Sequence, residues 1–64
     1  MKVYLVYSHT KQINIGIFDS FEKAQKYTYN FPAEKICVYE FELNKTNESG
    51  QEVFNSFFSS LLNL

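Results

Sequence analysis

The first 44 residues contain three segments whose apolar side chains are spaced as in β-strands. Residues 2–8 carry apolar side chains on both faces of an extended chain, which is typical of a central strand. Residues 13–18 place isoleucine at every second position, and residues 35–44 alternate apolar with polar side chains. We therefore predict three strands, with the first in the centre of the sheet.

Between the second and third of these segments the spacing becomes helical. Asp19 stands three positions before a glutamate, which is the spacing of a capping box, and Ser20 is an alternative cap. Phe21 and Ala24 then fall on one helical stripe, and Pro32 disfavours helical geometry at the residue before it. The pattern predicts one helix between the second and third strands.

The end of the chain carries its apolar residues in pairs that recur every four positions. These pairs are Val53-Phe54, Phe57-Phe58 and Leu61-Leu62. On a helix this spacing lays two adjacent i,i+4 rows side by side and gives a broad apolar band. We predict a second amphipathic helix over residues 51–64, preceded by a polar linker at residues 45–50.

Together these elements predict an α+β fold with a three-stranded antiparallel sheet of strand order 2-1-3. Residues 1–44 would form a β-β-α-β core, and the linker and C-terminal helix would complete a single domain. We expect the first helix to cover the face with more apolar side chains, formed by Val3, Leu5, Tyr7, Ile13, Ile15, Ile17, Tyr39 and Phe41. The opposite face, formed by Tyr4, Val6, Phe18, Ile36 and Val38, would then receive a tail helix, either its own or a neighbour's.

A chain of 64 residues buries only about 60% of the surface that its unfolded form exposes, so a partner subunit would add stability. Cys37 is the only cysteine and His9 the only histidine, so the sequence offers neither an intrachain disulfide nor a structural zinc site, and we expect no cofactor. Two arrangements of the tail remain open: packing on its own sheet, or packing on a second copy. We favour the homodimer, with an interface formed by Phe54, Phe57, Phe58, Leu61 and Leu62.

Charge and hydropathy limit the molecules that we expect this protein to bind and the place where we expect it to act. The formal net charge is −1, and all six basic residues are lysines. Because arginine is the preferred residue for recognising phosphates and bases, its absence weighs against nucleic-acid binding. The chain opens directly on a strand pattern rather than a leader, and no apolar run reaches the roughly 18 residues of a membrane span. We therefore expect a cytoplasmic protein that does not enter membranes.

Residues that could perform catalysis are present but scattered. Cys37 lies among apolar neighbours in the third strand, whereas His9 lies in the hairpin connection, so a nucleophile and base pair is not indicated. Glu40 and Glu42 share one strand face, where a solvated edge beside lysines is the simpler interpretation. We expect no enzymatic activity.

Aromatic side chains on the sheet leave one alternative open. Tyr4, Val6 and Tyr39 form a possible ligand face, on which tyrosine rings could stack on single-stranded nucleic acid or a nucleotide. The basic residues that would hold a phosphate backbone are missing near them. We therefore keep this function as the alternative to protein binding.

Three segments, "KVYLVYS", "FDSFEKAQKY" and "VYEFEL", follow one another in residues 1–43. In this order they resemble a group of short, functionally uncharacterised β-β-α-β domains of phages and bacteria. The shared motifs are structural, so the resemblance carries over no active site. What it implies is a viral origin and a small protein that binds host machinery. We expect a non-enzymatic interaction protein, a phage-encoded modulator or inhibitor of a host protein such as a defence system.

Overall fold

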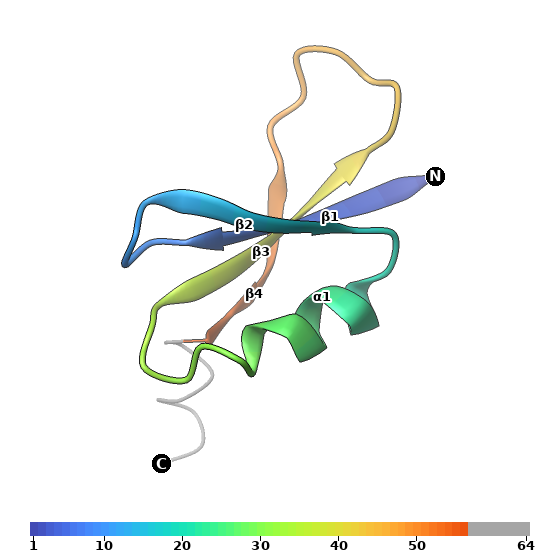
Figure 1. Cartoon of the computed structure of the whole chain (residues 1–64). Helices are drawn as coiled ribbons and strands as arrows, with labels where there is room; N and C mark the ends of the chain where they lie inside the picture. Colours follow the sequence, from blue (N-terminus) through green and yellow to red (C-terminus); the bar gives the residue numbers. More distant parts are fainter. Residues whose placement is uncertain (57–64) are drawn as a thin grey trace.

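The computed structural model describes residues 1–56, which form a single antiparallel sheet with one helix on one of its faces (Figure 1). The elements in chain order are β1 (Lys2–Ser8), β2 (Ile13–Phe18), α1 (Phe21–Thr28), β3 (Ile36–Glu42) and β4 (Gln51–Asn55). The strand order is β2-β1-β3-β4, and each neighbouring pair is antiparallel. β1 and β3 are therefore the inner strands, and β2 and β4 are the two edges.

The predicted fold of three strands and a C-terminal helix is wrong, because residues 51–55 form a fourth strand beside β3. Phe54 pairs with Val38 and Asn55 pairs with Cys37, and the register shifts between Val38 and Tyr39. At this irregularity the adjacent side chains of Val53 and Phe54 both pack against the hydrophobic core. A bulged strand thus places two adjacent apolar residues on the same side of the sheet, a spacing that the sequence alone indicates as part of a helix.

Residues 45–50, predicted as a linker, belong to the connection between β3 and its antiparallel neighbour β4. The turn uses left-handed backbone at Asn44 (φ 68°) and Asn47 (φ 56°), a conformation that asparagine tolerates better than most residues. The Glu48 carboxylate accepts a hydrogen bond from the backbone N–H of Glu42, at 3.2 Å for the nearer oxygen. This segment therefore returns the chain to its own sheet.

The core lies between the sheet and α1, on the face opposite to the one expected from apolar content. Val6, Ile36 and Val38 have no exposed surface, and neither has Ala24, the small helix residue that packs on them. Topology fixes the side of the sheet on which α1 lies, and the strand register decides which side chains point to that side. β2 and β3 run parallel because both pair antiparallel with β1, and a helical connection between parallel strands of one sheet is right-handed in almost all proteins. In Figure 1 the chain passes from the end of β2 through α1 to the start of β3.

α1 begins at the alternative cap of the two considered. The hydroxyl of Ser20 accepts a hydrogen bond from the Lys23 N–H at 3.2 Å, whereas Asp19 pairs with the Lys23 ammonium at 2.9 Å. The ring of Phe21 meets that of Tyr4 in an edge-on contact, with 6.1 Å between centroids. This contact fixes the start of the helix over β1.

A cluster of hydrogen bonds fastens the end of β4 to the rest of the domain. The Ser56 hydroxyl accepts from the N–H of Ile36 at 2.9 Å and donates to the carbonyl of Glu34 at 3.3 Å. The fully buried Ser8 donates to the Glu34 carboxylate at 2.9 Å and accepts from the N–H of Lys11 at 3.1 Å. The hairpin, the loop after α1 and the edge strand are thereby held together.

Candidate functional site

The face of the sheet opposite α1 is the candidate site, and we call it the open face. Side chains alternate between the two faces of a strand, so the register gives its composition. It forms three rows across the strands: Asn14, Tyr7, Cys37 and Asn55; then Ile17, Leu5, Tyr39 and Glu52; then Val3 and Phe41. Within residues 1–56 the one helix, α1, lies on the other face of the sheet.

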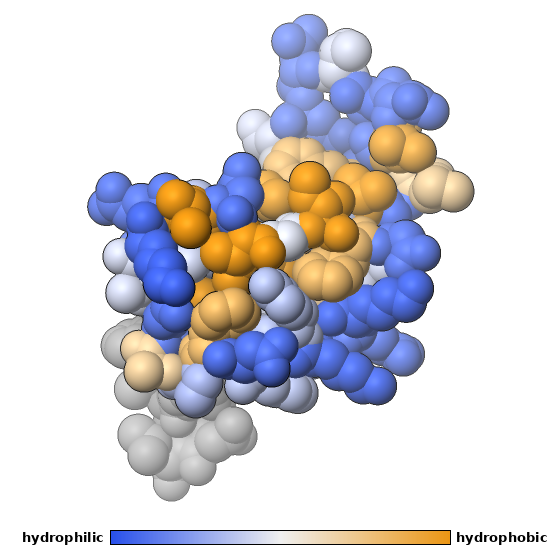
Figure 2. Space-filling view, in the orientation of Figure 1, coloured by the Kyte–Doolittle hydropathy of each residue, from blue (hydrophilic) through white to orange (hydrophobic). Residues whose placement is uncertain are grey.

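The open face is apolar and aromatic on the two inner strands, and its margins carry one apolar side chain, Ile17, and three polar ones at positions 14, 52 and 55. Val3, Leu5 and Phe41 are partly exposed, and Ile17 at the β2 edge is 70% exposed. Figure 2 shows apolar surface along β2, between the polar connection from β3 to β4 and the polar outer side of α1. In these three rows the register places one charged side chain, Glu52, and it lies on the β4 edge.

An aromatic and polar cluster occupies the end of the open face near the hairpin. The Tyr7 and His9 rings meet edge-on with 4.8 Å between centroids, and His9 Nε2 lies 3.2 Å from the Tyr39 hydroxyl. Tyr39 also hydrogen-bonds to the sulfur of Cys37. Tyr39 thus contacts both His9 and Cys37, although these two residues lie far apart in the sequence.

The Cys37 thiol is held in its protonated form. Burial raises its pKa to about 11, and the hydrogen bond that the thiol makes to the Glu52 carboxylate adds to this effect. The amide of Asn55 donates to the same carboxylate at 2.8 Å, which fixes its position. A thiol with a raised pKa is a weak nucleophile at neutral pH, so this arrangement does not favour covalent catalysis. Within residues 1–56 no three histidine, cysteine or acidic side chains gather as a metal site would need.

The structure does not bring together the three residues predicted as a ligand face. Tyr4 and Val6 point toward α1, where Val6 is fully buried in the core and Tyr4 contacts the helix. Tyr39 pairs with Leu5, and so its side chain lies on the open face. The one-residue alternation of strand faces separates Tyr39 from the other two.

The predicted tail interface is divided by the new strand. Phe54 belongs to β4, where it is half-buried and packs against the hydrophobic core of its own chain. The other four residues of that prediction, Phe57, Phe58, Leu61 and Leu62, lie outside the described residues.

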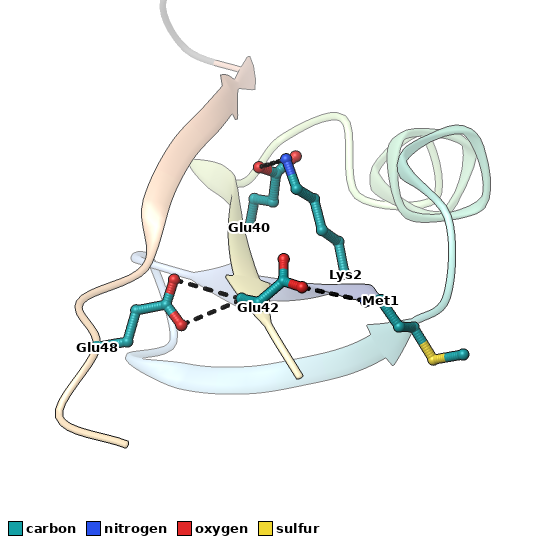
Figure 3. A network of polar contacts seen from close by, with 5 residues as sticks. All are labelled: Met1, Lys2, Glu40, Glu42 and Glu48. Atoms are coloured by element: carbon teal, nitrogen blue, oxygen red, sulfur yellow. Dashed lines mark hydrogen bonds and ion pairs between the residues drawn. The ribbon is translucent and has the colours of Figure 1, made fainter. Parts of the chain in front are cut away.

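The paired glutamates of β3 have a structural role at the end of the sheet. In Figure 3, Lys2 of β1 reaches Glu40 at 3.0 Å, and the amino group of Met1 reaches Glu42 at 3.1 Å. The Glu48 carboxylate approaches the backbone of Glu42 from the other side. The hydrogen bond from Lys2 holds the pKa of Glu40 below its usual range, so this carboxylate is charged at neutral pH. An ionised, paired glutamate is poorly suited to act as a general acid.

The main residues of the open face were expected beneath the helix, and Leu5, Tyr7 and Phe41 were therefore not considered as site residues. Apolar content carries no signal that identifies them: the right-handed connection from β2 to β3 fixes only the side of the sheet on which α1 lies, and the strand register decides which side chains point to it.

No known protein family, curated protein or solved structure matches this chain. In residues 1–56, no helix has the length and apolar character that a membrane crossing needs.

Proposed function

We propose that this protein acts without catalysis, by binding another protein through the open face of its sheet. The observation that carries the proposal is the contrast between the two faces. α1 buries one face, while on the other Leu5 and Tyr39 are partly exposed in the same row as Ile17, which is 70% exposed. Contiguous apolar surface of this kind is typical of interaction sites.

The composition of the open face supports a protein partner. The centres of protein interfaces are enriched in aromatic residues and depleted of charge, and here Tyr39 lies inside the central row while Glu52 lies at its β4 edge. The matching surface on a partner would be apolar and uncharged at its centre.

The nucleic-acid alternative receives less support from the same face. Binding to a phosphate backbone depends on lysine and arginine. Within residues 1–56 the register places neither residue in the three rows, and it does place the Glu52 carboxylate there. The phage origin and the host target stay predictions from the sequence.

The test compares one substitution on the open face with one away from it. Ile17 and Tyr29 are both largely exposed, at 70% and 66%, so Ile17→Lys and Tyr29→Lys introduce the same charge at positions that folding tolerates. Each immobilised variant is used to capture proteins from a bacterial lysate. Any protein retained by the wild type is identified, purified and titrated against all three chains by calorimetry.

Binding by the wild type and by Tyr29→Lys, with a loss of at least about tenfold in affinity for Ile17→Lys, would support the proposal. A purified partner that binds Ile17→Lys as tightly as the wild type would contradict it, because the open face would then be dispensable.

A further inference from the structure

The open face also has the properties of a surface that binds its own copy. We infer that two chains associate by packing their open faces together, sheet on sheet, in a symmetric dimer. This inference rests on the proposed function, since it names the first protein that the open face would bind.

The first argument is self-complementarity. In a two-fold dimer the same patch occurs on both sides, so a patch pairs well with itself when its centre carries no charge. The central row of the open face places Leu5 and Tyr39 between Ile17 at one edge and Glu52 at the other. The only charge of the row therefore falls at the margin, where solvent can still reach it.

The second argument is geometric. Two antiparallel sheets pack face to face at about 10 Å, with strands within about 30° of each other, and their inner side chains form a shared core. The open face offers three rows spaced by two residues along the strands, as such packing requires. The row nearest the hairpin has Asn14 at its β2 margin, and an amide can both donate and accept hydrogen bonds to a second copy.

The third argument concerns area and predicts a weak dimer. Four strands about 4.8 Å apart and about six residues long cover a face of roughly 19 by 20 Å, or on the order of 400 Å² in projection. Two such faces together cover about 800 Å² in projection. Because side chains make each face uneven, the accessible area buried between them is larger than this projection and approaches the lower limit of stable interfaces. We therefore expect dissociation constants in the micromolar range, with monomer and dimer in exchange.

The experiment is sedimentation equilibrium on the full chain, at concentrations from about 1 μM to about 500 μM, a range that spans micromolar dissociation constants. The wild type and Tyr29→Lys should pass from the 7.6 kDa monomer to twice that mass. Ile17→Lys should remain monomeric or weaken association at least about tenfold, because each substitution enters a symmetric interface twice. Leu5→Lys, at the centre of the face, should be at least as damaging, with circular dichroism confirming that it is folded.

Two results would overturn the inference. One is a wild type that stays monomeric throughout the range. The other is a dimer that Ile17→Lys and folded Leu5→Lys leave unchanged, since the contact would then lie elsewhere. A monomeric wild type that nevertheless binds a purified heterologous partner through Ile17 would reject the second copy and leave the proposed function standing.

Discussion

Replacing Gly16 by alanine tests how β2 lies against the helix. A Cβ atom at this position would lie 2.7 Å from Cε2 and 3.1 Å from Cζ of the Phe18 ring, and 3.5 Å from Cε2 of Tyr27. The first distance is too short for carbon atoms, so the ring must move. Phe18 already packs on Tyr27 with 5.2 Å between centroids, which limits where it can go. The glycine is therefore required by space, since its backbone has no positive φ.

Two opposing effects set the size of the change. Overpacking a core contact typically costs about 1–3 kcal/mol. Against this, alanine restricts the unfolded chain more than glycine does, which stabilises the protein by about 0.4–1 kcal/mol. We expect Gly16→Ala to lower the free energy of unfolding by about 1–2 kcal/mol, and the melting temperature by about 4–8 °C per kcal/mol in a domain of this size.

The assay is urea unfolding at 25 °C, followed by circular dichroism, with the slope m required to stay constant. Phe18→Leu and the double variant complete a thermodynamic cycle. Once the ring is removed, Gly16→Ala should become neutral or slightly stabilising. A Gly16→Ala protein that is more stable than the wild type would refute this reasoning. That result is expected if Gly16 faces solvent, as the alternation of the sequence predicts, because alanine would then act only by restricting the unfolded chain.

Three further outcomes follow from single contacts. Ser20→Ala should lower the free energy of unfolding by about 0.5–2 kcal/mol in urea titrations, since it leaves the Lys23 N–H without its cap, and Ser20→Asp should restore most of the loss. Because pairing with Lys2 lowers the pKa of Glu40, this ion pair stabilises the fold at pH values above the unfolded pKa, and the stabilisation is lost as pH falls through the folded pKa. Lys2→Met should therefore make the free energy of unfolding fall less steeply toward acid pH. An unchanged slope would contradict the pairing. Alkylation of Cys37 by iodoacetamide at pH 7.5 should be at least about 20-fold slower in the native protein than in urea, and equal rates would show that the thiol is neither buried nor raised in pKa.

The spacing of apolar residues predicts the type and position of a helix or strand where the element's own side chains determine them. The strands predicted over residues 2–8 and 13–18 have these bounds in the structure, and the third, predicted over residues 35–44, runs from Ile36 to Glu42. A helix also forms before Pro32, although it ends at Thr28. In each case the repeat of apolar residues matches the period of the element that forms.

The position of α1 could not be obtained by counting apolar residues. The right-handed connection puts α1 on one side of the sheet, and the register turns the face with fewer apolar residues to that side, where the paired Val6 and Val38 pack with Ala24. An irregularity in the register of β2 adds to the difference. It separates Ile15 from Ile17: Ile17 stays on the face of Leu5, with which it pairs, while Ile15 packs against the core. A prediction that assumes strict alternation of side chains cannot include such a shift in register.

The fourth strand changes what the open face can bind. A three-stranded sheet would end at β3, leaving Cys37 and Tyr39 on an unpaired edge. With β4 in place the two residues are internal, and the added strand contributes Glu52 and Asn55 beside them. The same strand brings Phe54 to the core side, so one face gains an aromatic ring and the other a carboxylate. A segment that the sequence suggested as an apolar interface thus supplies the polar margin of the open face, and the apolar centre around Leu5 comes from the inner strands.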